Sequence, residues 1–524
     1  MAGVVLLVLK FSLSHVVDPW RYTGDARQHV FWTYRFADPE LFPDDLMVEF
    51  ISTFRFDPPG FQAAYAVGAR AMDALLFSKL LGALLCLVSG ALAWDVGRRA
   101  AGPRAGALCA LLVGALVFDN MRYALPRAFA FPAVLMMLQA LQAKSPLRAS
   151  VAILAAGLFY PALLPVFGTA CGVRLLIRRR RGERRGNVIL VATIVGVAGL
   201  VLWTHVLSDP EVAGPFVTRT QSLAMPEFQS DGRDPYWDED PVVYWLGNWG
   251  NDPSACGLLS LNIFVPFWIC LLTLAWRRRE FRWMGGPGLL FGAGLAWFLL
   301  AHLLLFRLYV PARQTMYVWP MALAILAGVN LAPVLERPLE FARTLLGGWR
   351  GATAFALAAL IIVSIVIERG PRAPDAERQS LFAAIRALPK DVVIAGIPKD
   401  LDDIPLFTKR SVFMNEELSV AWYTSYHKHV RARIRGTLDL LFAGQPADVR
   451  AHARRLGITH VLVNKRVLRA DPSDTRGLMN PPYHEDLAAL LRRGPPALLD
   501  PAAAFTVLYD GPDFALVGLE ESGR

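Results

Sequence analysis

The sequence predicts a polytopic α-helical membrane protein that carries an extramembrane α/β domain at its C-terminal end. Of its 524 residues, 54% are hydrophobic and only 19% are charged, whereas about 25% of residues are charged in an average soluble domain. Long apolar segments recur along the chain as far as residue 368, and basic and acidic loops alternate between them. The remaining residues alternate short β-branched runs with polar helical periods, which is typical of a small α/β domain.

A helix that crosses a membrane needs about 20 apolar residues, with roughly 17–25 tolerated. On this rule we predict eleven spans, near residues 2–17, 75–96, 105–118, 128–143, 149–159, 161–177, 187–207, 256–276, 284–306, 314–334 and 352–368. Three of these segments, 105–118 and the pair within 149–177, are short. The pair is separated because Pro161 and Pro165 would break one long helix. The N-terminal segment lacks a basic leader and a cleavage site, so we expect a retained first helix.

The loops between the predicted spans alternate in charge. Basic clusters near residues 98–104, 144–148, 178–185, 277–282 and 337–350 occupy every second loop. Under the positive-inside rule these loops are cytoplasmic, with the N-terminus on the same side. An odd number of spans then places the other set of regions outside the inner membrane of a bacterium: the first loop (18–74), the short loops Asp119–Arg127 and Arg307–Arg313, a second long loop (208–255) and the C-terminal domain (369–524).

Charge and cysteine content exclude some classes of protein. The net charge of +10 could indicate a nucleic-acid partner, but the arginines lie in short runs between apolar segments, where membrane topology explains them. We therefore expect no nucleic acid. All five cysteines lie in or beside apolar segments, so no disulfide framework is implied.

The first loop, Trp20–Gly60, combines acidic and aromatic residues. Between Asp18 and Asp57 it holds eight carboxylates against four arginines, together with many aromatic rings. Aromatic side chains favour the membrane–water boundary. Two interpretations stay open: a segment that acts on a lipid-borne polar group, or a loop that only caps the helices.

The C-terminal domain follows a linker marked by Pro371 and Pro374. We predict strands at Val392–Ile397, Ser411–Met414, Thr459–Asn464 and Ala504–Tyr509, and helices at Ala432–Phe442 and Asp448–Leu456. The motif His427-Lys428-His429 has no nearby cysteine and is expected on a solvated helix face.

Several short motifs resemble the GT-C class of membrane glycosyltransferases. Gly24–His29 (GDARQH) follows the first helix, where protein O-mannosyltransferases and aminoarabinose transferases have an Asp-Glu pair and oligosaccharyltransferase catalytic subunits also have an Asp. Here the pair is Asp25-Ala26, so only the Asp matches. Asp57–Gln62 resembles the entry to the class's loop helix, and Trp94–Arg99 its second-helix exit. PRAFAFP, MPEFQSDGR and RLYVPARQ resemble a little-characterised bacterial branch.

The resemblance implies transfer of a sugar from a polyprenyl-phosphate donor to a glycan, lipid or protein acceptor at the outer face. Asp25 would be the general base, with a pKa raised by partial burial. Its alternative is a helix cap or an ion pair with Arg21 or Arg27. Arginine binds phosphate oxygens bidentately. The candidates for the donor phosphate are Arg122, Arg127, Arg307 and Arg313, with membrane anchoring as the alternative, and Asp119 could shape the same cavity.

In the second long loop, Glu227 and Arg233 are candidates for acceptor recognition, with a purely structural cover as the alternative. We assign no metal and no cofactor, although Asp44-Asp45 or Asp231–Asp240 could bind a divalent cation. Gly285–Gly288 is expected to be a turn, because it lacks the Lys-Ser/Thr of a phosphate loop.

Two rival functions stay open. A lipid-linked glycan transporter or flippase would use charges within the membrane, for which only Lys10, Lys79 and Asp95 are available. A non-catalytic envelope-assembly protein would keep the fold without the acidic pair.

Overall fold

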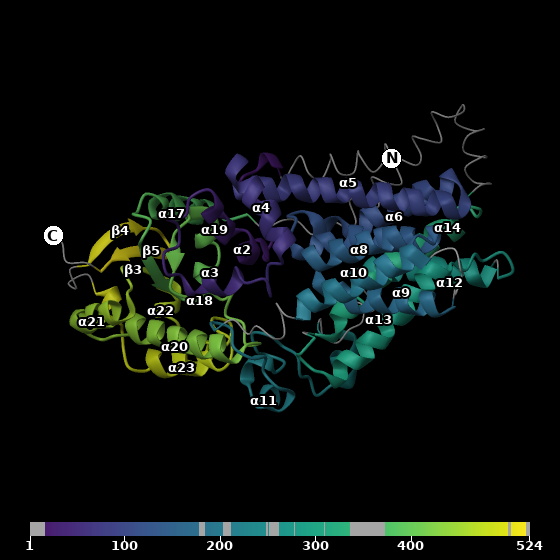
Figure 1. Cartoon of the computed structure of the whole chain (residues 1–524). Coiled ribbons are helices and arrows are strands. Elements are labelled where there is room, and N and C mark those ends of the chain that lie inside the picture. Colours follow the sequence, from purple (N-terminus) through teal and green to yellow (C-terminus); the bar gives the residue numbers. More distant parts are fainter. Residues whose placement is uncertain are drawn as a thin grey trace, which may run out of the picture.

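The computed structural model describes residues 16–177, 184–202, 211–247, 250, 261–276, 278–308, 310–335, 373–500 and 505–519. A bundle of helices forms one part of the molecule, and a mixed α/β domain lies at one end of it (Figure 1). The helices of the first loop lie between these two parts.

The bundle contains nine helices among the described residues: α5 (Ala74–Ala101), α6 (Pro103–Met121), α7 (Ala130–Ala143), α8 (Pro146–Phe159), α9 (Leu164–Ile177), α10 (Arg184–Leu202), α12 (Leu261–Trp276), α13 (Gly285–Leu303) and α14 (Val318–Leu331). Every predicted span between residues 75 and 334 contains one of them. The predicted spans 2–17 and 352–368 lie almost entirely outside the described residues. Among the described residues, only α5 and α13 are long and apolar enough to cross a membrane by themselves, so a total of eleven spans stays a prediction.

Local sequence explains where these helices begin and end. The Asp73 carboxylate accepts hydrogen bonds from the N–H groups of Leu75 (3.0 Å) and Leu76 (3.2 Å) and so caps α5. That helix ends at Gly102, whose φ of +88° suits glycine. The predicted break near Pro161 is confirmed, because α8 ends at Phe159 and a 3-10 turn precedes α9.

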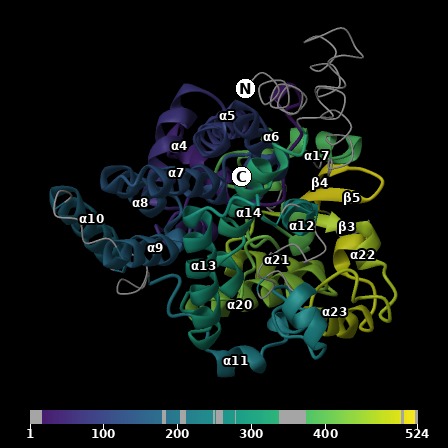
Figure 2. The ribbon, with the colours of Figure 1, turned by 90° about the vertical axis from the view of Figure 1, so that its right-hand side faces the viewer.

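Small residues allow the central helices to approach closely. Viewed from the end of the bundle, α14 lies between α8–α10 on one side and α12 on the other (Figure 2). A Cβ added to Gly97 of α5 or to Gly328 of α14 would lie 2.6 Å from the Cys109 sulfur of α6. Such close contacts through small residues are typical of membrane helices. Apolar side chains on the outer helices, including Val195 and Leu272, are exposed as expected of a lipid-facing surface.

Among the described residues, three of the predicted basic loops, near 98–104, 144–148 and 277–282, lie at the end of the bundle away from the α/β domain. Val96 and Ala100 of α5, Lys144 after α7, Arg174 of α9 and Arg282 before α13 all line one cavity there. For these described loops the fold agrees with the predicted position on one face, and the alternation along the whole chain stays a prediction. Which face is cytoplasmic stays a prediction.

The first loop folds as α2 (Ala26–His29), the 3-10 helix η1 (Phe31–Phe36), α3 (Leu46–Ile51) and α4 (Pro59–Ala71). Its rings were expected at the membrane boundary, but many are buried against protein. Phe50 stacks on Tyr426 of the C-terminal domain with ring centroids 3.5 Å apart, and Trp20 contacts Phe407 at 5.3 Å. Burial of aromatic area against the α/β domain therefore accounts for the composition of this loop better than lipid contact does.

The C-terminal domain holds a five-stranded sheet of order β2-β1-β3-β5-β4. Its strands are β1 (Val393–Gly396), β2 (Ser411–Val412), β3 (His460–Asn464), β4 (Thr506–Asp510) and β5 (Phe514–Gly518). The pairs β1–β2 and β1–β3 are parallel, whereas β3–β5 and β4–β5 are antiparallel. The four predicted strands are present, and β5 was missed.

Helices cover this sheet: α17 (Ala376–Arg386), α18 (Pro398–Leu401), α19 (Ile404–Thr408), α20 (Thr424–Leu441), α21 (Pro446–Leu456), α22 (Lys465–Leu468) and α23 (Tyr483–Leu491). The two predicted helices correspond to α20 and α21, and α20 begins earlier than expected. The expectation that His427 is solvated was wrong. His427 is buried because it faces the second long loop.

Candidate functional site

Asp25 is the N-cap residue of α2 and lies in the first loop. Its backbone carbonyl begins the helix by accepting from the N–H groups of Gln28 and His29. Its side chain makes no capping hydrogen bond. Instead, the carboxylate forms an ion pair with Arg127. The side chains stay 36% and 28% exposed, respectively, so the pair can be reached from solvent.

Three short 3-10 turns at helix ends supply the surroundings of Asp25. They are η2 (Pro126–Phe129), η3 (Pro161–Leu163) and η8 (Pro311–Gln314). Each begins with proline, which fixes φ and needs no N–H acceptor at a helix start. Arg127 comes from η2 and Arg313 from η8, and Arg313 donates to the hydroxyls of Tyr160 (2.8 Å) and Tyr317 (3.0 Å).

The electrostatic balance at Asp25 differs from the expected one. Burial raises the pKa of the Asp25 carboxyl, but the charges of Arg127, His29 and Arg313 together lower it below its ordinary value. The expectation of a raised pKa was therefore wrong for the chain alone, because sequence could not show that Arg127 and Arg313 both lie close enough to act on this carboxylate. Asp25 is consequently an anion at neutral pH.

A second buried network lies one helical turn along from Asp25. The Nδ1 atom of His29 is 2.6 Å from one oxygen of Asp57, and the indole N–H of Trp32 donates to the other at 2.6 Å. Burial raises the pKa of the Asp57 carboxyl. Sequence analysis placed Asp57 only in a helix-entry motif and did not single out His29. The four-residue spacing of Asp25 and His29, about one helical turn, was the sequence signal that could have identified His29.

Arg27, from the same short helix, points to the C-terminal domain instead of the site. Its guanidinium forms ion pairs with Asp402 (3.1 Å), Asp403 (3.4 Å) and Glu417. Arg21 is paired with Asp18. Neither of the two arginines considered as partners of Asp25 is therefore its partner.

Glu227 and Arg233 of the second long loop also contact the C-terminal domain. Glu227, next to α11 (Arg219–Leu223), accepts two hydrogen bonds from Arg431 (2.9 and 2.8 Å) and lies 3.0 Å from His427. Arg233 donates to the backbone carbonyls of Glu416 (2.9 Å) and Glu417 (3.1 Å). These contacts support the structural-cover interpretation of the loop.

The other two predicted phosphate ligands have different surroundings. Arg307 is exposed in the turn after α13. Arg122 is buried beside α5, where a Cβ on Gly82 would lie 2.6 Å from the Arg122 carbonyl oxygen. Neither contributes to the electrostatics of Asp25 as Arg127 and Arg313 do. Asp119 falls within α6, and its side chain is outside the described part.

The charges that a transporter would use also have local partners. Lys79 donates to the backbone carbonyl of Asp18 at 2.9 Å, and Asp95 pairs with Arg98 and Arg99. Lys10 lies outside the described residues. No group of three His, Cys, Asp or Glu side chains suited to a metal ion occurs in the described ranges.

Comparison with known proteins gives similarity in structure but not in sequence. Neither the family profiles nor the curated proteins compared with the chain match it. The crystal structure of ArnT from Cupriavidus metallidurans in the apo state has a TM-score of 0.55 at 15% identity, covering 99% of this chain and 98% of ArnT. Its complex with undecaprenyl phosphate has a TM-score of 0.54 at 15% identity, covering 99% and 97%.

An Archaeoglobus fulgidus oligosaccharyltransferase in complex with Zn and sulfate has a TM-score of 0.50 at 11% identity. The alignment covers 89% of this chain and 68% of the archaeal protein. At such identities the likeness concerns the fold, which these proteins share from the bundle into the C-terminal region.

Proposed function

We propose that this chain, which has the fold of the GT-C membrane glycosyltransferases, transfers a sugar from a polyprenyl-phosphate donor to an acceptor at the outer membrane face. The observation that carries the proposal is the convergence of Asp25, Arg127 and Arg313 from three separate segments. One anion beside two cations, open to solvent, suits a reaction that removes a proton and releases a phosphate. The bound undecaprenyl phosphate in the ArnT structure supports the class of donor.

In the proposed reaction Asp25 accepts the proton of the acceptor's nucleophilic group. The nucleophile then forms a bond to the anomeric carbon of the sugar, and the bond from that carbon to the phosphate oxygen breaks. The bonding electrons leave with the polyprenyl phosphate. Arg127 and Arg313 would bind the phosphate oxygens and stabilise the charge that develops there.

Donor binding would also change the pKa of the Asp25 carboxyl. In the free protein Arg127 is paired with the carboxylate and holds its pKa down. A bound phosphate would compete for that guanidinium and place a second negative charge nearby. Both effects raise the pKa of a carboxyl group. Asp25 would therefore become a stronger base only when the donor is present, which limits unproductive proton transfer in the free enzyme.

The membrane location of the site follows from the same proposal. The site lies at the end of the bundle opposite the basic loops, so the positive-inside rule places it at the outer face with the C-terminal domain. The polyprenyl chain would lie along the exposed apolar helices, and the sugar would extend toward the first loop. The acceptor is a glycan, a lipid or a protein that reaches this face.

The test uses purified full-length protein in detergent and a panel of polyprenyl-phosphate sugars, with released polyprenyl phosphate measured for each. Asp25→Asn should lower release about 10²–10⁴-fold, the usual contribution of a general base. Asp38→Asn is the matched control, because Asp38 lies in the same loop, is also 36% exposed and is also paired with a cation, Lys390.

Equal activity in the Asp25→Asn and Asp38→Asn variants would refute the role of Asp25. Failure of the unaltered protein to release polyprenyl phosphate from any donor, with or without membrane extract as acceptor, would refute the activity itself. That result would favour an envelope-assembly protein in which the Asp25–Arg127 pair is structural.

A further inference from the structure

A cavity of about 480 Å³ lies at the basic end of the bundle, away from Asp25. Its walls are largely apolar and include Leu138 and Leu141 of α7, Pro287 and Leu289 of α13, and Val329 of α14. Five helices contribute to it, so it is built into the bundle. Nothing in the proposed glycosyl transfer uses this cavity.

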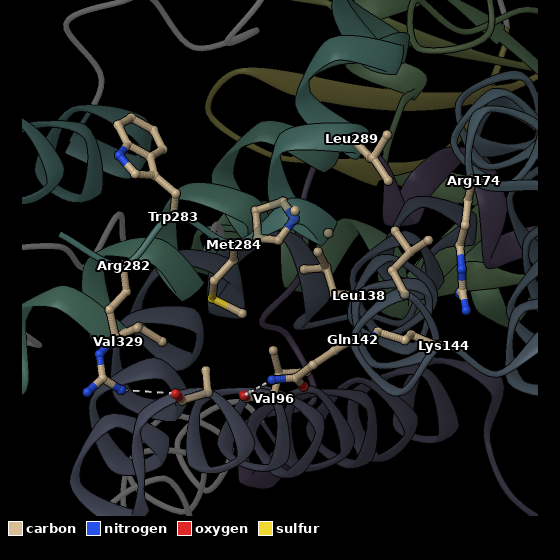
Figure 3. Close-up of a pocket in the computed structure, with 15 residues that line it drawn as sticks. Val96, Leu138, Gln142, Lys144, Arg174, Arg282, Trp283, Met284, Leu289 and Val329 are labelled. Atoms are coloured by element: carbon tan, nitrogen blue, oxygen red, sulfur yellow. Dashed lines mark hydrogen bonds between the residues drawn. The ribbon is translucent and has the colours of Figure 1, made fainter. Parts of the chain in front are cut away.

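Three cations line the cavity: Lys144, Arg174 and Arg282. Arg174 and Lys144 stand on one side of it and Arg282 on the other (Figure 3). Arg282 donates to the backbone carbonyl of Ala100 at 3.1 Å. In the described part of the chain, neither Lys144 nor Arg282 has a carboxylate within ion-pair distance, and no acidic residue is among those that line the cavity.

The N-terminus of α13 adds to this positive field. The segment Gly285–Gly288 was expected to be a turn, but it forms the first turn of a 19-residue helix. Met284 at the N-cap provides no side-chain hydrogen bond, so the N–H groups of Gly285 and Gly286 have no cap, whereas Pro287 has no N–H and Gly288 donates to the Met284 carbonyl. A Cβ at Gly285 would meet nothing within 4 Å. Helix N-termini of this kind bind anions, and phosphate groups in particular.

The side-chain oxygen of Gln142 adds a hydrogen-bond acceptor to the polar groups that line the cavity. The Gln142 amide donates to the Val96 carbonyl at 3.1 Å, while its buried oxygen has no partner among the described residues. A ligand that carries a donor next to its anionic group would satisfy this oxygen. Unpaired buried acceptors are uncommon, because leaving one unsatisfied costs about 1–3 kcal/mol.

The outer surface around the cavity is strongly apolar. Leu176 and Ile177 of α9 are 78% and 74% exposed, and Trp283 beside the cavity is 71% exposed. Exposed rings and aliphatic chains next to cations are typical of the level of lipid headgroups. A ligand at this place would therefore arrive from the bilayer.

We propose that this cavity binds one anionic phospholipid of the leaflet that faces the basic loops. Its anionic headgroup lies among Lys144 and Arg174 on one side, Arg282 on the other and the N-terminus of α13, and a hydroxyl or ammonium of the headgroup donates to Gln142. Its acyl chains lie along the apolar walls. Because it is bound between α5, α7, α13 and α14, the lipid links helices that are distant in sequence.

The test measures lipid binding to the detergent-purified full chain by native mass spectrometry. Phosphatidylglycerol is compared with phosphatidylcholine of the same acyl chains. The unaltered protein should retain one phosphatidylglycerol at least about tenfold more tightly than phosphatidylcholine, a difference of about 1.4 kcal/mol or more. The double variant Lys144→Gln/Arg282→Gln should lose this preference.

The matched control is Arg104→Gln/Arg148→Gln, which removes two exposed charges from the same end without touching the cavity. It should bind phosphatidylglycerol as the unaltered protein does. Leu289→Trp keeps all the charges but fills the cavity, and it should also lose the lipid. Circular dichroism of each variant confirms that it is folded.

Three results would overturn the proposal: equal retention of both lipids, retention of phosphatidylglycerol by the cavity variants, or equal loss in the control. Displacement of the lipid by excess glycerol phosphate would show that the site binds a free phosphate compound, which also contradicts the proposal.

Discussion

Replacement of Arg27 by Gln should destabilise the protein, because one buried guanidinium serves three carboxylates. Arg27 is 9% exposed, and its partners Asp402, Asp403 and Glu417 all belong to the C-terminal domain. Removal of one member of a buried ion pair typically costs about 3–5 kcal/mol, since the remaining charges lose their compensation. We expect a loss of free energy of unfolding in that range at about pH 8.

The loss should depend on pH in a defined direction. Burial raises the pKa of Asp402 from 3.8 to about 7, although Arg27 opposes the increase. The folded state thus holds a proton at pH values where the unfolded state has released it, so the contribution of this group to stability falls as the pH rises through that window. Without Arg27 the pKa of Asp402 rises further, so the stability of the variant continues to decrease as the pH rises above 7.

The assay is a urea titration in detergent, followed by tryptophan fluorescence, at about pH 6 and about pH 8.5. Arg21→Gln is the control, because Arg21 is 35% exposed and makes a single pair with Asp18. An exposed pair of this kind contributes at most about 1 kcal/mol. The reasoning would be refuted if the two variants lost equal stability, or if the deficit of Arg27→Gln did not grow with pH.

Three further predictions follow from the fold and the site. Arg313→Lys should reduce sugar transfer about tenfold or more, because lysine cannot bind phosphate bidentately, whereas Arg307→Lys should leave the rate unchanged; equal rates would favour an anchoring role for Arg313. Gly328→Val should lower the melting temperature, because even the Cβ of the new side chain would lie only 2.6 Å from the Cys109 sulfur of α6. An unchanged melting curve would show that the helices can separate at low cost. Single cysteines at Arg148 and Asp448 should react with impermeant reagents from opposite sides of the membrane, and same-side labelling would contradict the odd number of spans.

Local sequence signals predicted much of the architecture. Apolar length and the prolines at 161 and 165 located the helices of the bundle, because these properties act within one segment. β-branched runs located four strands of the sheet. The fifth, Phe514–Gly518, was missed because it contains only one β-branched residue, Val517, and is held by pairing with β3 and β4. That dependence on distant partners is invisible in one window of sequence.

The candidate site was predicted only in part for the same reason. Asp25 was identified through the resemblance of Gly24–His29 to the GT-C class, and Arg127 and Arg313 by residue type and by their place in predicted outer loops. Which arginine faces Asp25 depends on how the proline-started turns pack, and in the structure Arg127 and Arg313 act on its carboxylate. The lowered pKa of Asp25 is a property of that packing. Tyr160 and His29 were not singled out, because their roles arise from contacts with Arg313 and Asp57.

The attachment of Arg27 to the C-terminal domain has a consequence for biosynthesis. Asp402 follows Arg27 by 375 positions in the chain, so the ribosome makes the first loop long before its anionic partners exist. At about 5–20 residues per second, tens of seconds would pass between the synthesis of Arg27 and the synthesis of its carboxylate partners. We expect the half-made polypeptide to be inactive, with activity arising only after the last segment has been translocated and folded. Completion of synthesis would then act as a checkpoint that prevents truncated chains from consuming lipid-linked sugar.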